Sequence, residues 1–168
     1  MSSAVALVLF LAFAVLNWSS GAEDVVRHST VRVLFMSAQC IETRKESKAD
    51  FLLGNDQLRN FFSLQNSGQI GVDALAPPLV DFSKESLLYL SMGERPTAGY
   101  GISLSQEQFL YSKDEAEIGI VWEEPGVNAV VAQVITSPCV LLAVSKEKYK
   151  DIRVVDQLGI SRWVLSVP

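Results

Sequence analysis

Few residues in this chain could carry enzymatic chemistry. His28 is the only histidine among 168 residues, and it lies in a polar segment, Glu23 to Ser29, that we expect to be frayed. Nucleophilic catalysis by a Ser-His-Asp or Cys-His arrangement would have to use this one side chain, as would a histidine-ligated metal site. The chain also has no P-loop or dinucleotide fingerprint. We therefore predict no metal and no cofactor.

Paired carboxylates are the remaining source of acid–base chemistry. Glu123 stands beside Glu124, and Asp114, Glu115 and Glu117 form a second acidic group. Two carboxylates can act as general acid and base, but acidic turns also keep an apolar chain in solution. We favour the second interpretation, and the second group lacks the EF-hand spacing for calcium. The sequence thus predicts a protein that is not an enzyme.

The strongest candidate for a binding site is one loop rich in glycine. It comprises Gly93, Glu94, Arg95, Pro96, Thr97, Ala98, Gly99, Tyr100 and Gly101. Its proline fixes one backbone angle, and its glycines permit positive φ or close backbone approach. A loop stiffened in this way loses less conformational entropy on binding. We expect Arg95 and Thr97 to be exposed to a partner, whereas Tyr100 is as well suited to the core as to a contact.

The N-terminus predicts export. Residues 5–16 are apolar without a break, and Ser20-Gly21-Ala22 supplies the small residues of a signal-peptide cleavage site after Ala22. A membrane anchor is the alternative, but this apolar run is too short for a bilayer core of roughly 30 Å. We expect a periplasmic or secreted protein without membrane insertion after cleavage, in which residues 23–168 form a single β-rich domain.

Charge and cysteine content narrow the class of protein further. The formal net charge is −5, which disfavours nucleic acid as a partner because phosphate binding needs clustered Lys and Arg. The two cysteines, Cys40 and Cys139, favour a disulfide in an exported chain, the alternative being two buried thiols. Their wide spacing excludes a CxxC redox motif and a multi-cysteine zinc site.

Alternating apolar residues predict a mainly β fold. We expect a loop or helix start over 42–50. One short helix is expected over 56–64, capped by Asn55 and indicated by the helical spacing of Leu58, Phe61, Phe62 and Gln65. Strands should follow, with 87–92 buried on both faces and forming a hairpin with 100–104 across the glycine-rich loop. The expected fold is a β-sandwich or partly open barrel of about seven to eight strands with one short helix. The eight expected strand segments are 31–35, 87–92, 100–104, 118–122, 130–134, 140–144, 152–155 and 163–167, and Phe109 and Tyr111 form a further short segment.

One stretch of the chain, from about 80 to 145, resembles the PrcB C-terminal domain family, also called the protease complex subunit PrcB family. The resemblance is carried by Val80-Asp81-Phe82, the apolar strand from Leu87 to Met92, the Arg95-Pro96-Thr97-Ala98-Gly99-Tyr100 element, and Thr136-Ser137-Pro138-Cys139. It implies a small exported subunit that associates with a surface protease and supports its maturation or stability. It brings no catalytic residues.

The same loop is similar, more distantly, to one loop of chagasin-like inhibitors of cysteine proteases. Those proteins insert an Asn-Pro-Thr-x-Gly-Tyr loop of an immunoglobulin-like sandwich into the protease cleft. Here Arg95 replaces the asparagine, and the other two inhibitory loops have no clear counterpart. Three functions therefore stay open: a protein-binding module that binds or stabilises a protease, a peptidase inhibitor acting through residues 93–101, and a structural envelope protein without a ligand.

Overall fold

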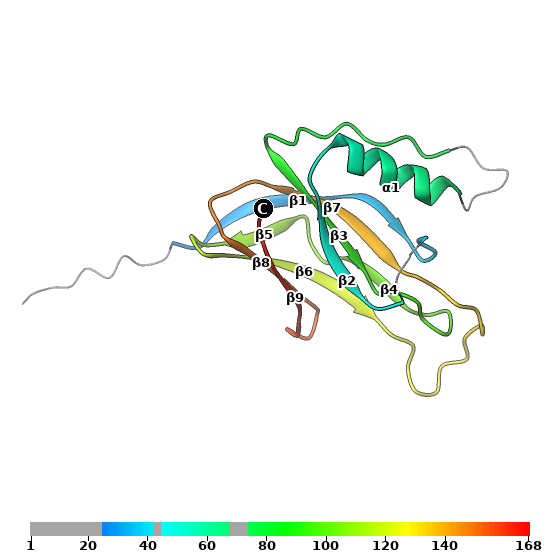
Figure 1. The fold of residues 1–168 in the computed structure, drawn as a ribbon. Coiled ribbons are helices and arrows are strands. Elements are labelled where there is room, and N and C mark those ends of the chain that lie inside the picture. Colours follow the sequence, from blue (N-terminus) through cyan, green and yellow to red (C-terminus); the bar gives the residue numbers. More distant parts are fainter. Residues whose placement is uncertain (1–24, 42–44, 68–73) are drawn as a thin grey trace, which may run out of the picture.

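The fold is mainly β, with one short helix on the outside (Figure 1). In this computed structural model, the residues described are 25–41, 45–67 and 74–168. The predicted signal peptide, residues 1–22, lies outside them. The elements are β1 (Arg27–Ser37), β2 (Lys48–Leu52), α1 (Asn55–Ser67), β3 (Glu85–Ser91), β4 (Gly101–Leu104), β5 (Gln108–Tyr111), β6 (Glu115–Glu123), β7 (Cys139–Ser145), β8 (Asp151–Val155) and β9 (Ser161–Ser166).

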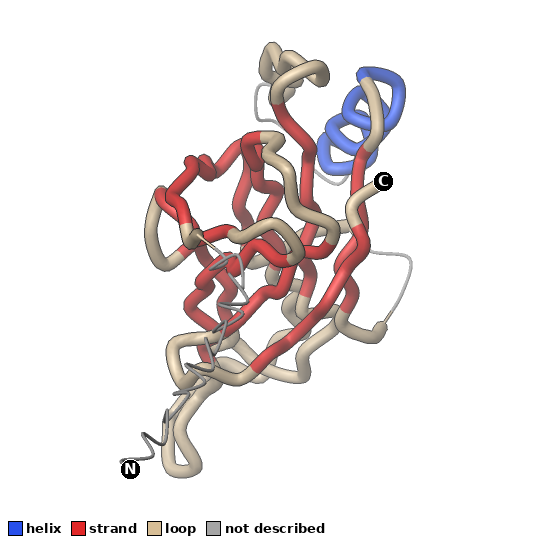
Figure 2. The backbone as a smooth tube through the Cα atoms, turned by 90° about the vertical axis from the view of Figure 1, so that its left-hand side faces the viewer, coloured by secondary structure: helices blue, strands red, loops and turns tan. Residues whose placement is uncertain are grey.

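The strands form one nearly closed mixed barrel. Their order is β2-β3-β7-β1-β5-β6-β8-β9, with β4 paired to β6 beside this path. All pairs are antiparallel except β6 with β8. The two end strands, β2 and β9, bring Cα atoms within 8 Å of each other, and Figure 2 shows the strands wrapping around a common interior. The predicted class is confirmed, in its barrel form.

Strand β1 joins the two halves of the barrel because it pairs with different strands along its length. Residues from Arg27 to Thr30 pair with β5, and those from Val31 to Ser37 pair with β7, with an irregularity between Val33 and Phe35. The prediction that the segment before Val31 is frayed is wrong for residues 27–29. Their backbone groups are paired in the sheet, so His28 belongs to a strand.

A second correction concerns residues 42–50, predicted as a loop or helix start. Residues 48–50 open strand β2, which pairs with β3 over the register Lys48↔Ser91 to Leu52↔Leu87. Residues 42–44 lie outside the described part. Charged residues concealed this strand because Lys48 and Asp50 interrupt the apolar pattern. Strand β2 forms because it pairs with the apolar central strand β3, and its own sequence does not show this.

Strands β3 and β7 are buried on both faces, and for β3 this confirms the prediction from its apolar sequence. Leu88, Leu90 and Leu142 face the barrel interior, where they pack with Phe109 and Ile118. The alternate residues face outward and are covered by the helix; they are Leu87, Tyr89, Leu141 and Ala143. Because successive side chains point to opposite faces of a sheet, a strand with both faces covered must be apolar throughout.

Helix α1 covers the outer face of these strands. Leu58, Phe62 and Gln65 are its buried residues, at the predicted helical spacing. The Gln65 side chain accepts from the Ile41 N–H at 2.8 Å and donates to the Ile41 carbonyl at 3.3 Å, so it replaces a backbone partner for a segment outside the sheet. The helix starts at Asn55, and the Leu58 N–H donates to the Gly54 carbonyl at 3.1 Å. Gly54 therefore takes the capping place predicted for Asn55.

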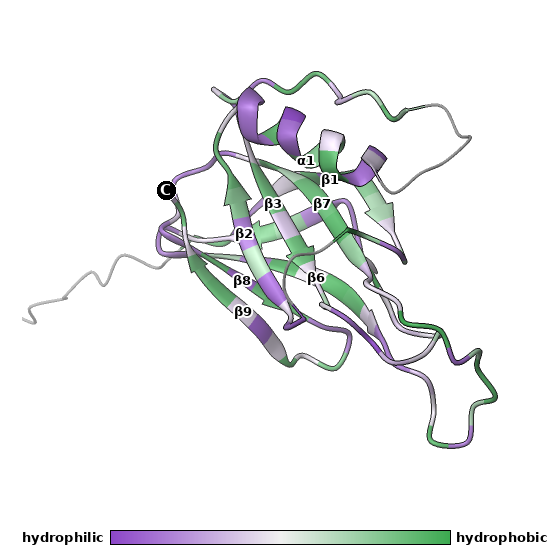
Figure 3. Cartoon of the chain, turned by 45° about the vertical axis from the view of Figure 1, so that its right-hand side comes forward, coloured by the Kyte–Doolittle hydropathy of each residue, from purple (hydrophilic) through white to green (hydrophobic). Residues whose placement is uncertain are grey.

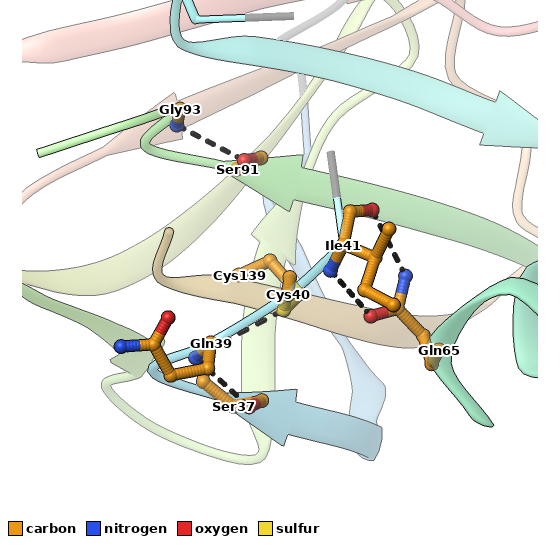
Figure 4. The surroundings of a disulfide bond; sticks show 8 residues. All are labelled: Ser37, Gln39, Cys40, Ile41, Gln65, Ser91, Gly93 and Cys139. Carbon is orange, nitrogen blue, oxygen red and sulfur yellow. Dashed lines mark hydrogen bonds between the residues drawn. A yellow bond between two sulfur atoms is a disulfide. The ribbon is translucent and has the colours of Figure 1, made fainter. Parts of the chain in front are cut away.

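Cys40 and Cys139 form the predicted disulfide (Figure 4). Their Cα atoms lie 6.0 Å apart, within the range that disulfides adopt. The Cys40 N–H donates to the Ser137 carbonyl at 2.9 Å, which fixes the end of β1 beside the start of β7. Disulfides persist in oxidising compartments, so this one is consistent with an extracytoplasmic protein.

Among the described residues, no helix is long and apolar enough to span a membrane. Nor does this part of the chain contain a group of three or more His, Cys, Asp or Glu side chains placed to hold a metal ion.

Candidate functional site

The 93–101 loop connects strands β3 and β4, which are not neighbours. Strand β3 pairs with β2 and β7, whereas β4 pairs with β6. The predicted hairpin across this loop is therefore wrong. Sequence proximity favoured pairing of consecutive strands, but β3 is already paired on both edges, so the chain must cross to another part of the barrel. This crossing explains why the loop is longer than a tight hairpin needs.

The loop is attached along its length to the segment before β7. Arg95 and Thr136 exchange two backbone hydrogen bonds, of 2.7 Å and 2.9 Å. The Ala98 N–H donates to the Ala132 carbonyl at 3.0 Å, and the Thr136 hydroxyl donates to the Thr97 carbonyl at 3.0 Å. The 93–101 loop and residues 124–138 are thus two loops of one end of the barrel, and each positions the other.

Two glycines of the loop have positive φ, as its composition predicts. Gly93 has a φ of 71° and Gly99 a φ of 90°, values that L side chains adopt at a cost. Gly93 also permits close approach, because an added Cβ would lie 2.6 Å from the carbonyl oxygen of Glu46. At Gly99 the added atom would lie 3.2 Å from side-chain atoms of both Pro125 and Val131. Gly99 therefore marks where the two loops touch.

The side chain of Arg95 lies against aromatic rings. Its guanidinium carbon is 5.7 Å from the ring centroids of both Tyr100 and Trp122, close enough for a cation–π interaction. Its Nε is buried and has no hydrogen-bond partner in the structure. No described residue is an ion-pair partner of Arg95 or accepts a hydrogen bond from its side chain. The group is held in place by rings and lacks a polar acceptor.

The expected exposure of the loop residues needs correction. Arg95 and Thr97 are partly buried rather than exposed, because Arg95 lies on two rings and the backbone of Thr97 is bonded to Thr136. Tyr100 is partly buried and packs against the barrel core. The residues of the loop that are exposed are Glu94, Pro96 and Gly99. The exposed side chains of the loop are therefore those of Glu94 and Pro96.

Trp122 contacts a second arginine, Arg162, which is paired with a buried carboxylate. The guanidinium carbon of Arg162 lies 4.4 Å from the Trp122 ring centroid, and its Nη2 lies 2.7 Å from the carboxylate of Asp156. The burial of Asp156 raises its pKa, but hydrogen bonds from the backbone of Ile160 and Leu158 and from Arg162 outweigh this and hold the pKa below its usual value. Asp156 is therefore ionised at neutral pH.

A shallow depression of about 540 Å³ lies beside this group. It is lined by Gly99, Trp122, Glu123, Glu124, Gln157, Leu158 and Arg162. The Trp122 indole N–H donates to the Glu124 carboxylate at 2.7 Å, and the Gln157 amide exchanges two hydrogen bonds of 2.8 Å with the Trp122 backbone. Trp122, Asp156 and Arg162 were not among the predicted site residues, because Trp122 lies 34 and 40 positions before the other two and meets them only in the fold.

Residues 124–138 form a long loop that projects from the barrel (Figure 1, yellow to orange). Val127 and Val130 are each 103% exposed, and Ile135 is 64% exposed. We predicted a strand over 130–134 from its alternating pattern, and this is wrong: these residues pair with no strand. The sequence does contain a sign of this apolar loop, since no charged residue occurs from Pro125 to Ser145. Figure 3 shows hydrophobic residues along this projection.

The other residues considered for chemistry lie elsewhere and have structural partners. Arg153 is 2.9 Å from the carboxylates of both Glu115 and Glu117. Lys150 is 2.7 Å from Asp114, and its hydrogen bond and charge hold the pKa of that carboxyl below its usual value. These acidic side chains therefore carry ion pairs across the end of the barrel that is formed by β6 and β8.

The central part of the chain is similar to a known protein family. Residues 86–145 match the family model described as PrcB C-terminal. The chain carries a PrcB C-terminal domain. Neither a curated protein nor a solved structure matches the chain significantly.

The PrcB C-terminal domain includes both loops of the site. Its residues run from the second residue of β3 to the last residue of β7, so they contain 93–101 and 124–138. Strands β1, β2, β8 and β9 and helix α1 lie outside the matched residues. They complete the barrel around the PrcB C-terminal domain and supply Arg162 and Asp156 from the C-terminal side.

Proposed function

We propose that this chain is an exported, non-enzymatic protein-binding module that engages its partner through the 93–101 loop. The proposal rests on the Arg95 side chain, which is held by aromatic rings but has no hydrogen-bond acceptor among the described residues. Its guanidinium is fixed by Tyr100 and Trp122 at 5.7 Å, yet no described residue accepts a hydrogen bond from it. Tyr, Trp and Arg are the residues that most often dominate binding energy at protein interfaces.

The partner that we propose is a protease, and the role is that of an accessory subunit that binds or stabilises it. The PrcB C-terminal domain over residues 86–145 supports this role. The Cys40–Cys139 disulfide supports a periplasmic or secreted location after removal of residues 1–22. A carboxylate or a backbone carbonyl of the partner would be the acceptor for Arg95, because a guanidinium donates to either.

A second candidate function is inhibition of a peptidase. It is favoured by one observation, the projection of a second loop beside 93–101, because a pair of adjacent loops can enter a cleft that one loop could not fill. The mature chain should then inhibit a papain-like protease at micromolar concentration. If papain retains full activity at that concentration, the chain does not inhibit papain-like proteases. The accessory role is tested separately, by the capture experiment below.

The test of the proposed function is capture with loop variants. The tagged mature chain would be used to isolate partners from the envelope fraction of the source cell, and the recovered partner would be purified and its dissociation constant measured. Arg95→Ala should weaken binding at least about tenfold, the size expected for an interface anchor. Thr97→Ala should weaken it less, because its side chain is partly buried within the loop.

The matched control is another arginine of the barrel surface. Arg32 is exposed on β1 and is bonded to Glu85 at 2.8 Å, away from both loops. Arg32→Ala should leave the dissociation constant unchanged. If Arg95→Ala and Thr97→Ala also leave it unchanged, the loop is not the binding site and the proposal fails.

A further inference from the structure

The projecting loop exposes more apolar side chain than its own fold requires. Val127 and Val130 are each 103% exposed, and Ile135 and Val134 are 64% and 46% exposed. An isolated exposed valine is ordinary on a protein surface, but contiguous apolar residues on a projection mark interaction sites. These four residues lie within nine positions of one another in an uncharged stretch from Pro125 to Ser145.

The loop is ordered by its own hydrogen bonds and by the neighbouring loop. The Ala129 N–H donates to the Gly126 carbonyl at 2.9 Å, which forms a turn at the tip. The Ala98 N–H donates to the Ala132 carbonyl at 3.0 Å, and the Val131 side chain lies beside Gly99. The apolar residues are therefore divided: Val131 packs against the 93–101 loop, while Val127 and Val130 face outward.

Charge at the base of the loop indicates what would cover it. Glu123 and Glu124 are exposed immediately before Pro125, and the chain as a whole has a net charge of −5. An anionic bilayer surface would repel these carboxylates, and no Lys or Arg within 125–145 offsets them. A protein cleft with an apolar floor and basic residues at its rim would complement both the valines and the glutamates.

We propose that Val127, Val130, Val134 and Ile135 form an apolar contact surface that enters an apolar, basic-rimmed cleft of a protein partner. This rests on the proposed function, because the surface adjoins the 93–101 loop through Gly99 and Ala98. It adds a second contact of different chemistry: the 93–101 loop supplies the fixed guanidinium of Arg95, and the projecting loop supplies the apolar area.

The first arm of the test is site-specific photo-crosslinking in the envelope fraction. The photoreactive residue p-benzoylphenylalanine would replace Val130 in one form of the mature chain and Leu79 in the control form. Leu79 is 98% exposed but lies before β3, on another segment. We expect a crosslink from position 130 alone, to a partner peptide that is apolar and flanked by Lys or Arg. Equal crosslinking from both positions, or none from 130, would overturn the inference.

The second arm separates this inference from the proposed function. With the purified partner, Val127→Ser with Val130→Ser should weaken binding at least about tenfold, whereas Leu79→Ser should not change it. If the valine variant binds normally while Arg95→Ala does not, the apolar contact is wrong and the proposed function stands. If neither variant loses affinity, both are wrong.

The same protein variants also test two other possible occupants of this surface, an anionic membrane and a second copy of the chain. Vesicles of phosphatidylcholine and phosphatidylglycerol should not bind the mature chain, and the chain should remain monomeric in analytical ultracentrifugation. Vesicle binding that the paired valine substitutions abolish would show that the surface inserts into a membrane. Self-association that the same substitutions abolish would show that it contacts a second copy. Either result would overturn the inference.

Discussion

Arg95 and Thr136 exchange two backbone hydrogen bonds, with N–O distances of 2.7 Å and 2.9 Å. They lie 41 positions apart, and this short antiparallel bridge joins the two loops at one end of the barrel. Because the bridge uses backbone atoms, it leaves the Arg95 side chain to lie against Tyr100 and Trp122. One end of the molecule thus combines a fixed cation with an exposed apolar loop.

Gly93→Ala should destabilise the protein strongly. Gly93 has a φ of 71°, a conformation that costs an L residue about 1–2 kcal/mol. Its new Cβ would also lie 2.6 Å from the Glu46 carbonyl oxygen, so the backbone would have to shift. We expect the free energy of unfolding, measured in urea, to fall by about 3 kcal/mol or more.

Gly159→Ala is the matched control for this substitution. Gly159 has a similar φ of 75°, but nothing lies within 4 Å of the added atom. The loss should be about 1 kcal/mol, from backbone strain alone. Equal losses at the two positions would mean that the close approach of Gly93 to Glu46 contributes nothing.

Removal of the disulfide should cost about 2–5 kcal/mol. Cys40 and Cys139 are separated by 99 positions, so their link restricts a long segment of the unfolded chain. Replacing both residues by alanine, with urea unfolding as the measurement, tests this. Reductant should lower the stability of the natural chain and leave that of the double variant unchanged. A loss below about 1 kcal/mol would contradict the expectation.

The buried carboxylate of Asp156 should make the protein sensitive to acid. Its pKa is lowered in the folded state, where burial opposes but hydrogen bonds from Ile160, Leu158 and Arg162 prevail. A lowered folded pKa contributes stability that is fully present above the unfolded value of about 3.9 and is lost as pH falls through the folded pKa.

Asp156→Asn provides the measurement. At pH 7 the variant should have a lower urea midpoint than the natural chain, because Arg162 loses its ionic partner. As the pH falls below about 4, the midpoint of the variant should fall less steeply than that of the natural chain, because the titrating group is gone. Parallel pH profiles for the two proteins would show that Asp156 is not the source of the acid sensitivity.

The paired substitution Val127→Ser with Val130→Ser should leave stability unchanged within about 0.5 kcal/mol. Both side chains are fully exposed, so no buried apolar area is lost. Val131→Ser is the contrasting change, because this residue is partly buried and touches Gly99. It should lower the thermal midpoint measurably. A large loss in the paired variant would mean that the outer valines support the fold.

The elements predicted best are those in which the pattern of apolar residues along the sequence matches the buried positions. Strands β3 and β7 are apolar at consecutive positions because both faces are covered. Helix α1 was predicted from the helical spacing of Leu58, Phe61, Phe62 and Gln65; Phe61 is partly buried and the other three are buried. The disulfide was predicted from two cysteines in a chain that we expected to be exported. A local pattern determined the strands and the helix, and the presence of only two cysteines determined the disulfide.

The predictions that failed depend on contacts between distant segments. The pairing of β4 with β6 rather than β3 follows from the occupied edges of β3, which no local pattern records. Residues 27–29 appear polar, yet β5 pairs with them. Val130 and Val134 have a strand-like alternation but no partner strand. The group around Trp122 was missed because Arg95, Asp156 and Arg162 meet there only in the folded chain.

Amide hydrogen exchange of residues 23–168, with and without the purified partner, tests most directly whether the two loops form one binding surface. We predict slower exchange on binding in both 94–101 and 126–135, with no change in α1 or on the exposed face of β1. The amides of Val127 and Val130, at the exposed tip, should show the largest change. Protection confined to α1 or β9, or to one of the two loops, would contradict the account.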